Sequence, residues 1–190
     1  MKTLTLHIKN MVCPRCETII RMELEQLGVQ ILVLRPGYAK VVLPESVTLS
    51  TIARRLQHHG FALLKDPDEQ LIERVKIATL EYVHHQEQAA VAGTAAPILS
   101  DFLSQALGKS YSQLSKLFSG HEGTTLEKYY IRLRIARVKE LLDDGELNVS
   151  EIARQLGYSS VHYLSAQFKK VTGQSVTHYR NESDTRRHYQ

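Results

Sequence analysis

The sequence predicts an α+β domain with the element order βαββαβ in residues 1–66, an all-α domain in residues 67–182 and a polar tail in residues 183–190. Two observations lead to this division. Before Asp66 strand-like and helix-like apolar patterns alternate, whereas after it the periodicity is helical. One pattern in the second part also occurs twice, which indicates two copies of one structural unit.

The first domain is expected to begin with a strand, because apolar side chains alternate at Leu4, Leu6 and Ile8. A helix follows, since Pro14 suits a first helical turn and Gly28 supplies a stop. Its apolar residues recur at roughly helical spacing: Ile19, Ile20, Met22, Leu24 and Leu27.

A hairpin and a second helix complete the first domain. Two β-rich runs, 29–34 and 38–43, are separated by Arg35-Pro36-Gly37, which is typical of a turn. A helix fits residues 48–59, and a last short strand fits residues 61–64.

The second domain is expected to start with a long helix. Asp66 suits the N-cap, Pro67 the first helical position, and Glu69 the position that closes a capping box. We therefore place the domain boundary after Asp66. The helix is expected to reach about Gln88 and to bury a face made of Leu71, Val75, Ala78 and Tyr82.

An internal repeat follows this helix. Aligning Leu114 with Leu164 brings Leu, Ser, Phe, Gly and Tyr of the two segments into register. Ahead of each copy, a short helical pattern ends in Leu-Gly, at 107–108 and at 156–157. Each glycine has a small residue four positions before it, Ser104 or Ala153.

The second copy meets the requirements of a helix-turn-helix. Asn148 and Glu151 can form a capping box, and Gly157 permits the tight turn. The helix after the turn, expected from about 160 to 171, would bury Leu164 and Phe168 and present its other side to a DNA major groove.

The segment from Ser150 through Gln167-Phe-Lys-Lys-Val-Thr-Gly to Tyr179 resembles the AraC/XylS family of bacterial regulators. The resemblance covers about residues 68–180. It implies two helix-turn-helix motifs joined by one long helix, here 125–143, whose recognition helices enter successive major grooves of promoter DNA. Transcriptional control is the implied function, with RNA polymerase and a second copy of the chain as further candidate partners.

The resemblance also implies which residues face the bases. In the first recognition helix these are Ser112, Ser115 and Lys116, and in the second Val161, His162, Ser165 and Ala166. Family members commonly carry Arg where Lys116 and Ala166 stand. Because a guanidinium makes a bidentate contact with guanine, the second motif is expected to discriminate less sharply between sequences.

Bulk charge does not single out the second domain as the DNA-binding part. Residues 1–66 hold nine Lys or Arg against five Asp or Glu, whereas residues 67–190 hold fifteen of each. Within residues 109–180, eleven basic side chains face seven acidic ones, an excess that can supply phosphate contacts. Three arginines of the long helix are expected on its solvated face: Arg132, Arg134 and Arg137.

Cys13 and Cys16 form a Cys-Pro-Arg-Cys loop between the first strand and the first helix, which leaves metal binding and dithiol redox chemistry open. With Met11 and the βαββαβ order, this segment resembles the heavy-metal-associated domain of copper chaperones, which implies a ferredoxin-like fold. It further implies that both cysteines bind Cu(I) or another soft ion. The helix N-terminus and Arg15 favour thiolates for such an ion.

Three alternatives remain for the first domain. The first is a redox-active dithiol. Asn10 stands where the family usually has Gly, and Pro14 stiffens the loop, as in dithiol redox loops of the glutaredoxin kind. The domain could also serve dimerisation and bind nothing. Histidines could complete a zinc site of higher coordination: His7, His58, His59, His84 and His85.

The remaining features narrow the class of protein. No apolar run reaches the ~20 residues of a membrane span, and the first residues lack the apolar segment of a signal peptide, so a cytoplasmic location is expected. No phosphate loop or catalytic constellation indicates an enzyme. The leading hypothesis is a sequence-specific transcriptional regulator that responds to, or is associated with, a soft metal ion. A redox-sensing regulator and a metallochaperone-like protein are the alternatives, and the helix-turn-helix repeat argues against the latter.

Overall fold

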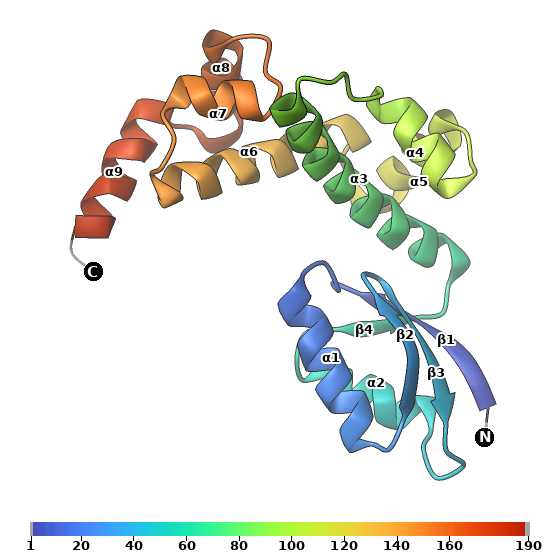
Figure 1. Ribbon diagram of the computed structural model, residues 1–190. Helices are drawn as coiled ribbons and strands as arrows, with labels where there is room; N and C mark the ends of the chain where they lie inside the picture. Colours follow the sequence, from blue (N-terminus) through green and yellow to red (C-terminus); the bar gives the residue numbers. More distant parts are fainter. Residues whose placement is uncertain (1, 189–190) are drawn as a thin grey trace. The chain divides into compact units, whose positions relative to one another are not determined.

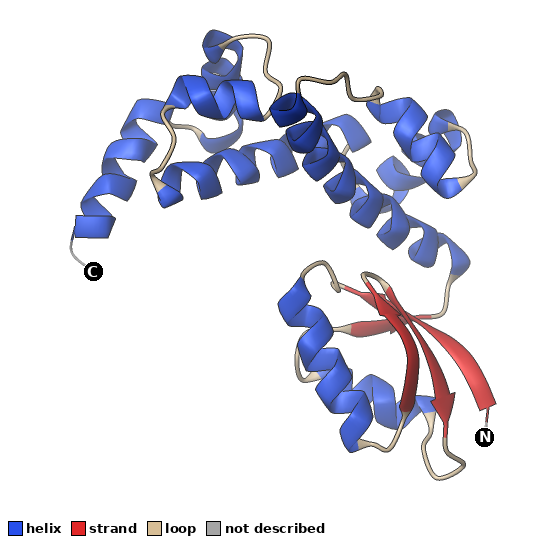
Figure 2. Ribbon diagram, viewed as in Figure 1, coloured by secondary structure: helices blue, strands red, loops and turns tan. Residues whose placement is uncertain are grey.

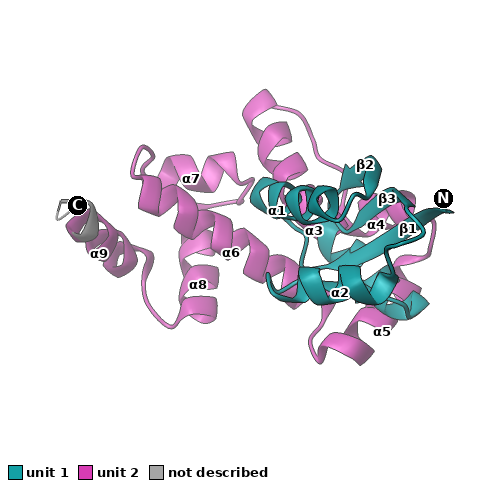
Figure 3. Ribbon diagram, turned by 90° about the horizontal axis from the view of Figure 1, so that it is seen from below, with its two compact units in different colours: residues 1–77 teal, residues 78–190 magenta. Residues whose placement is uncertain are grey.

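The computed structural model describes residues 2–188, with side chains as far as Thr185. The chain divides into two compact units, Met1–Ile77 and Ala78–Gln190, coloured separately in Figure 3. All strands of the described residues belong to the first unit, and the second is helical (Figure 2).

The first unit is a four-stranded antiparallel sheet with two helices. Its elements are β1 (Lys2–Lys9), α1 (Pro14–Gln26), β2 (Gln30–Arg35), β3 (Tyr38–Leu43), α2 (Leu49–Gln57) and β4 (Ala62–Leu64). The strand order is β2-β3-β1-β4, so the first strand lies inside the sheet between β3 and β4. The observed order of elements agrees with the predicted βαββαβ order.

Both helices cover the same face of the sheet (Figure 1). Alternate residues of β1, Leu6 and Ile8, point into this core, whereas Thr3 and Thr5, earlier on the strand, are exposed. Across the core, α1 and α2 contribute four fully buried side chains: Ile20, Leu24, Ile52 and Leu56. The N-terminal turn of α1, which carries the cysteines, therefore starts from a packed core.

The long helix α3 (Pro67–Ala92) crosses the division between the two compact units, which falls at Ile77, and the domain boundary after Asp66 stays a prediction. Asp66 is the N-cap as predicted, because its Oδ1 accepts hydrogen bonds from the N–H groups of Asp68 and Glu69, at 2.9 and 3.0 Å. The bond to the Glu69 side chain that would close the predicted capping box is not among the hydrogen bonds of the described residues. The first turns pack within the first unit. Glu73 accepts the backbone N–H of Asn10 at 2.8 Å, and Ile77 approaches Gly37 so closely that a Cβ there would collide with it.

The second unit holds the end of α3 and six further helices among the described residues. These are α4 (Leu99–Leu107), α5 (Tyr111–Glu122), α6 (Leu126–Asp144), α7 (Val149–Gln155), α8 (Val161–Thr172) and α9 (Val176–His188). The segment predicted as a polar tail, 183–190, continues α9 as far as His188, and residues 189 and 190 lie outside the described residues.

A core around α6 holds the second half of this unit together. Ile135, Val138 and Leu142 of α6 pack against Leu164 and Phe168 of α8. At the other end, Phe118 of α5 lies against Tyr129 of α6, with ring centroids 5.2 Å apart. Thus α6 contacts both halves of the unit. Among the described residues, none of the helices combines the length and the apolar character that a membrane span requires.

Candidate nucleic-acid interface and dithiol loop

The α7–turn–α8 segment has helix-turn-helix geometry, fixed by local hydrogen bonds. Asn148 Oδ1 accepts the N–H groups of Ser150 and Glu151, at 2.9 and 3.0 Å, and Glu151 Oε2 accepts the N–H of Asn148 at 2.7 Å. This is the predicted capping box. Gly157 closes the helix with φ of +66°, a conformation that favours glycine, and the buried Ala153 allows close packing.

The outer side of α8 is exposed. Ser160 caps the helix by accepting the N–H of Tyr163 at 3.1 Å, and Leu164 and Phe168 are fully buried. The four predicted base-facing residues lie on the opposite side: Val161, His162 and Ala166 are exposed, and Ser165 is half-buried. The structure therefore brings them onto one continuous surface.

The α4–turn–α5 segment repeats this arrangement. Gly108 again has a left-handed φ of +66°, and Ser110 and Gln113 form a capping box at the start of α5. Leu114 and Phe118 are fully buried, like their counterparts in α8. The predicted base-facing residues of α5 have the same exposure as their counterparts in α8. Ser112 and Lys116 are exposed, as are His162 and Ala166, and Ser115 is half-buried, as is Ser165.

Arg134 of the connecting helix α6 is not solvated, which corrects the prediction. Its side chain is buried, and its Nη2 donates to the carbonyl oxygen of Leu156 at 2.8 Å, at the end of α7. Its guanidinium also faces the rings of Tyr158 and Tyr130, at 3.7 and 5.6 Å from the centroids. Because Arg134 follows Ile131 by three residues and precedes Val138 by four, helical periodicity already places it on the buried face.

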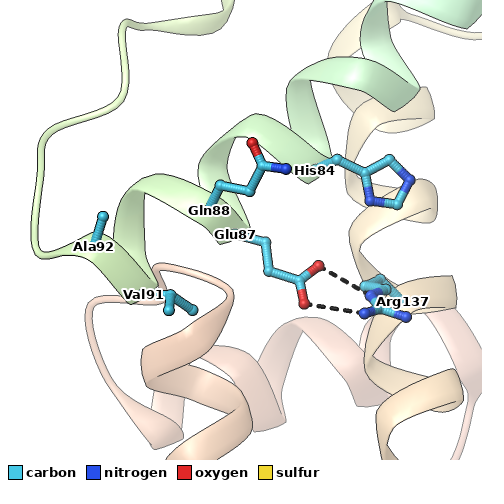
Figure 4. Close-up of a pocket in the computed structure, with 6 residues that line it drawn as sticks. All are labelled: His84, Glu87, Gln88, Val91, Ala92 and Arg137. Carbon is cyan, nitrogen blue, oxygen red and sulfur yellow. Dashed lines mark hydrogen bonds and ion pairs between the residues drawn. The ribbon is translucent and has the colours of Figure 1, made fainter.

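Arg137 is a second correction, since it is half-buried and paired. Its Nε and Nη2 donate to the two carboxylate oxygens of Glu87 on α3, each at 3.0 Å, as Figure 4 shows. Gln155 of α7 donates to the same carboxylate at 2.6 Å. Burial opposes the ionisation of Glu87, but the hydrogen bonds from Arg137 and Gln155 hold its pKa below the usual value. Sequence reasoning missed this junction because its partners lie 50 and 68 residues apart.

Of the three arginines of α6 that were predicted to be solvated, only Arg132 is exposed.

A pocket of about 480 Å³ lies beside the Glu87–Arg137 pair. It is lined by His84, Glu87, Gln88, Val91, Ala92 and Arg137. The ion pair forms part of its wall, so this pocket lies at a joint between helices.

The two cysteines lie together at the start of α1. Cys13 is the N-cap residue, its carbonyl oxygen accepts the N–H of Cys16 at 3.0 Å, and the two Sγ atoms are 2.7 Å apart. Burial disfavours the Cys16 thiolate, but hydrogen bonds from the Cys13 side chain and from nearby backbone N–H groups lower the pKa of Cys16 overall. Met11 is fully buried below the loop, and its carbonyl oxygen accepts the N–H of Gly37 at 3.2 Å.

The histidines do not complete a larger metal site. Within the described residues, His, Cys, Asp and Glu side chains form no group of three or more that could hold a metal ion. His59 instead contacts Glu23, with 2.9 Å between Nε2 and Oε1, and the pKa of His7 is lowered by burial and by the positive charge of Arg74. The donor set at the loop is therefore two sulfur atoms.

Two helix-turn-helix motifs joined by one helix define the second unit as a helical domain of the DNA-binding class. Residues 103–182 match the family model described as "Helix-turn-helix domain". A helix-turn-helix is a DNA-binding module, so this match agrees with the geometry of the second unit.

The chain is also similar to transcriptional regulators, which supports the resemblance to the AraC/XylS family. The probable transcriptional regulator LumQ of Photobacterium leiognathi is 30% identical over 115 residues, which cover 59% of this chain and 43% of that protein. The HTH-type transcriptional activator RhaR of Salmonella typhi is 34% identical over 74 residues, 37% of this chain and 26% of that protein. The chain spans less than half the length of the first curated relatives it matches.

Among solved structures, the C-terminal domain of AraT, a response regulator from Geobacillus stearothermophilus, is 26% identical. It covers 62% of this chain and 86% of its own, with a TM-score of 0.49.

Proposed function

We propose that the protein is a transcriptional regulator that binds promoter DNA with α5 and α8 in successive major grooves on one face of the duplex. One observation carries this proposal: at matching positions of the two helices, residues of the same exposure surround the same buried Leu and Phe. A surface that occurs twice suits a ligand that presents the same groove twice, about 34 Å apart.

The two recognition helices are expected to contribute unequally to base recognition. Lys116 of α5 can donate to the acceptors of guanine, and Ser112 and Ser115 can bond to several bases. In α8, His162 and Ser165 are the polar readers, whereas Ala166 and Val161 offer apolar contact with a thymine methyl group. Part of the recognition by α8 is therefore expected to come from DNA shape.

Selection of target DNA from a random duplex library, followed by hydroxyl-radical footprinting with the full chain, tests this proposal. The expected result is two protected segments whose centres lie about one helical turn apart, on one face, with one protein chain per site. A single protected groove, or binding only as a dimer on a palindrome, would contradict the tandem arrangement. A Lys116→Ala/His162→Ala variant serves as the control for the assigned surface.

We further propose that the first unit is a ferredoxin-like, heavy-metal-associated domain that holds Cu(I) between Cys13 and Cys16. The donor set supports this, because two soft sulfur atoms suit a d¹⁰ ion that accepts low coordination. The lowered pKa of Cys16 favours the thiolate that a metal ion requires. The bound ion would supply a conformational signal and no catalytic chemistry. The same pair of sulfur atoms supports the second candidate, a redox-sensing regulator in which they form a disulfide.

Native mass spectrometry of the freshly reduced full chain, with Cu(I) and with Zn(II), separates these candidates. Metal sensing predicts one Cu(I) per chain, or one bridging two chains, and its loss in the Cys13→Ser/Cys16→Ser variant. Redox sensing predicts no retained metal and a reversible mass loss of two hydrogens on mild oxidation. The same spectra report whether the chain pairs with a second copy, and transcription with purified RNA polymerase tests that remaining candidate partner.

A further inference from the structure

A second candidate contact surface lies beside the recognition helix α8. It is a groove of about 470 Å³ between the first half of α6 and the side of α8 that faces it. The groove is lined by Lys128, Ile131, Arg132, Tyr163, Ala166, Gln167, Lys170 and Val171. None of the seven residues besides Ala166 belongs to the predicted base-facing set.

The charge of this groove has one sign. Three of its lining residues are cations, Lys128, Arg132 and Lys170, and none is acidic. All three side chains are exposed, and no carboxylate of the described residues lies within ion-pair distance of any of them. Their positive charges therefore face solvent or a ligand, and they form no ion pair with the described residues.

Other cations of α6 behave differently. Arg134 donates to Leu156 and faces two tyrosine rings, and Arg137 pairs with Glu87 and Glu140. Lys139 lies over the ring of Tyr179, 5.3 Å from its centroid. The cations of α6 thus separate into those that hold helices together and those, Lys128 and Arg132, that share one groove with Lys170.

The groove adjoins the surface proposed to enter the major groove. Ala166 belongs to both surfaces, and Lys170 follows it by one helical turn. A DNA strand that borders a major groove passes beside any helix inserted there, because the groove is only about 12 Å wide. Phosphates of that strand would consequently meet the side of α8 that bears Lys170.

The uncharged lining also suits a DNA backbone. Tyr163, 51% exposed, and Gln167 provide hydroxyl and amide donors, two of the groups that commonly bind phosphate oxygens. Ile131 and the partly exposed Val171 offer apolar surface to deoxyribose.

We infer that Lys128, Arg132 and Lys170 form a phosphate clamp that binds the DNA backbone bordering the major groove occupied by α8. This inference rests on the proposed DNA binding and adds a site that reads no base. The clamp raises affinity for any duplex, and it compensates for the absence of an arginine from the base-facing surface of α8.

Salt dependence of DNA binding distinguishes a phosphate clamp from other roles. The test compares the full chain with a Lys128→Gln/Arg132→Gln/Lys170→Gln variant, by fluorescence anisotropy on the selected target and on a scrambled duplex, across a range of salt concentrations. A matched variant, Lys40→Gln/Arg54→Gln/Lys65→Gln, removes the same charge from exposed residues of the first unit. An Arg132→Lys variant keeps the clamp charge.

The clamp predicts a log–log salt slope shallower by about 2.7, because each phosphate contact contributes about 0.9. Affinity should fall by a similar factor on both duplexes, so that the ratio between them is kept. The matched variant and Arg132→Lys should retain the parent slope. Circular dichroism of each variant verifies that the helices are intact.

Each other outcome overturns one claim and spares the other. If the triple variant keeps the parent slope on the target, the clamp is wrong while the proposed function stands, and the groove then becomes a site for an acidic protein segment. If only the target affinity falls, the residues read bases and the clamp is wrong. If the parent shows no preference for any duplex but its general binding still depends on the three cations, the clamp stands and sequence-specific regulation fails.

Discussion

The guanidinium of Arg134 lies 3.7 Å from the centroid of the Tyr158 ring. Since Arg134 belongs to α6 and Tyr158 lies in the turn between α7 and α8, this contact ties the second helix-turn-helix to the connecting helix. Burial raises the pKa of Tyr158 to about 12, which keeps the ring neutral beside the cation. The Nε of Arg134 has no hydrogen-bond partner among the described residues. The buried guanidinium is therefore stabilised by the hydrogen bond to Leu156 and by its contacts with the tyrosine rings.

Replacing Arg134 should destabilise the second unit. Arg134→Ala removes a hydrogen bond from a charged donor and a desolvated cation–π contact, which together predict a loss of about 2–4 kcal/mol in the free energy of unfolding. Urea denaturation followed by circular dichroism measures this loss. The exposed neighbour gives the control, because Arg132→Ala should stay within about 0.5 kcal/mol of the parent. Equal stability of the two variants would contradict the structural role of Arg134.

The carboxylate of Glu87 should make the free energy of unfolding depend on pH in the acidic range. Its folded pKa is lowered, so its contribution is present above the unfolded value near 4.5 and is lost as the pH falls through the lower folded value. Glu87→Gln should therefore lower the unfolding free energy by about 1–3 kcal/mol at pH 7. The difference from the parent should shrink below about pH 4.5. Urea denaturation at pH 7, 5 and 3.5 checks this, with the exposed Glu81→Gln on the same helix as control.

Much of the fold was predictable because its signals are local. Asp66 and the Asn148–Glu151 pair cap helices with side chains two or three residues away, and Gly157 ends a helix through its own backbone freedom. The end of α3 was predicted four residues too early, at Gln88. Ala89 to Ala92 is rich in alanine, the strongest helix former, and simply continues the helix.

The junctions between helices were not predictable in the same way. Periodicity can place Arg134 on a buried face, but a bond to Leu156, 22 residues away, depends on the tertiary fold. The division at Ile77 likewise depends on Glu73 and Ile77 meeting residues of the β1–α1 loop and the hairpin turn. The exposure of the predicted base-facing residues follows from the register of two buried residues per helix, and their contact with bases stays a prediction.

The backbone of Asn10 makes a third prediction. Asn10 has a φ of +67°, and no other non-glycine residue among those described has a positive φ. Its Nδ2 donates a hydrogen bond to the carbonyl oxygen of Gly60 at 3.0 Å. Asn10→Ala should lower stability by about 1–2 kcal/mol, because alanine tolerates this region poorly. Asn10→Gly should stay within about 1 kcal/mol of the parent, since glycine adopts it freely. Thermal unfolding of both variants checks the order, and an Ala variant as stable as the Gly variant would contradict it.

The recognition helices give a fourth prediction. Lys116→Ala should weaken binding of the selected DNA by about 5- to 150-fold, corresponding to roughly 1–3 kcal/mol for a lost base contact. Ala166→Ser should have a smaller effect, because it removes no charged donor. Anisotropy titrations at one fixed salt concentration compare the two variants with the parent. A larger loss for Ala166→Ser would reverse the assigned importance of the two helices.

The last prediction concerns coupling through α3, which is continuous from Pro67 to Ala92. Near its start, Glu73 binds the backbone of Asn10, three residues before Cys13, and near its end Glu87 binds Arg137 and Gln155 of the second unit. A change of state at the cysteines is therefore expected to reach the helix-turn-helix motifs through one continuous helix. Couplings of this kind amount to about 1–3 kcal/mol, which corresponds to roughly a 5- to 150-fold change in DNA affinity.

Titrating target DNA with the reduced apo, Cu(I)-loaded and oxidised protein, at fixed salt, measures this coupling. We expect one of the two modified forms to differ from the apo form, and the Cys13→Ser/Cys16→Ser variant to keep the apo affinity under all three treatments. Glu87→Gln should reduce the difference, because it weakens the end of α3 that contacts α6 and α7. Equal affinity of all three forms, with the same assembly state, would mean that the first unit does not act through DNA affinity, and recruitment of a partner or pairing of two chains would then be its role.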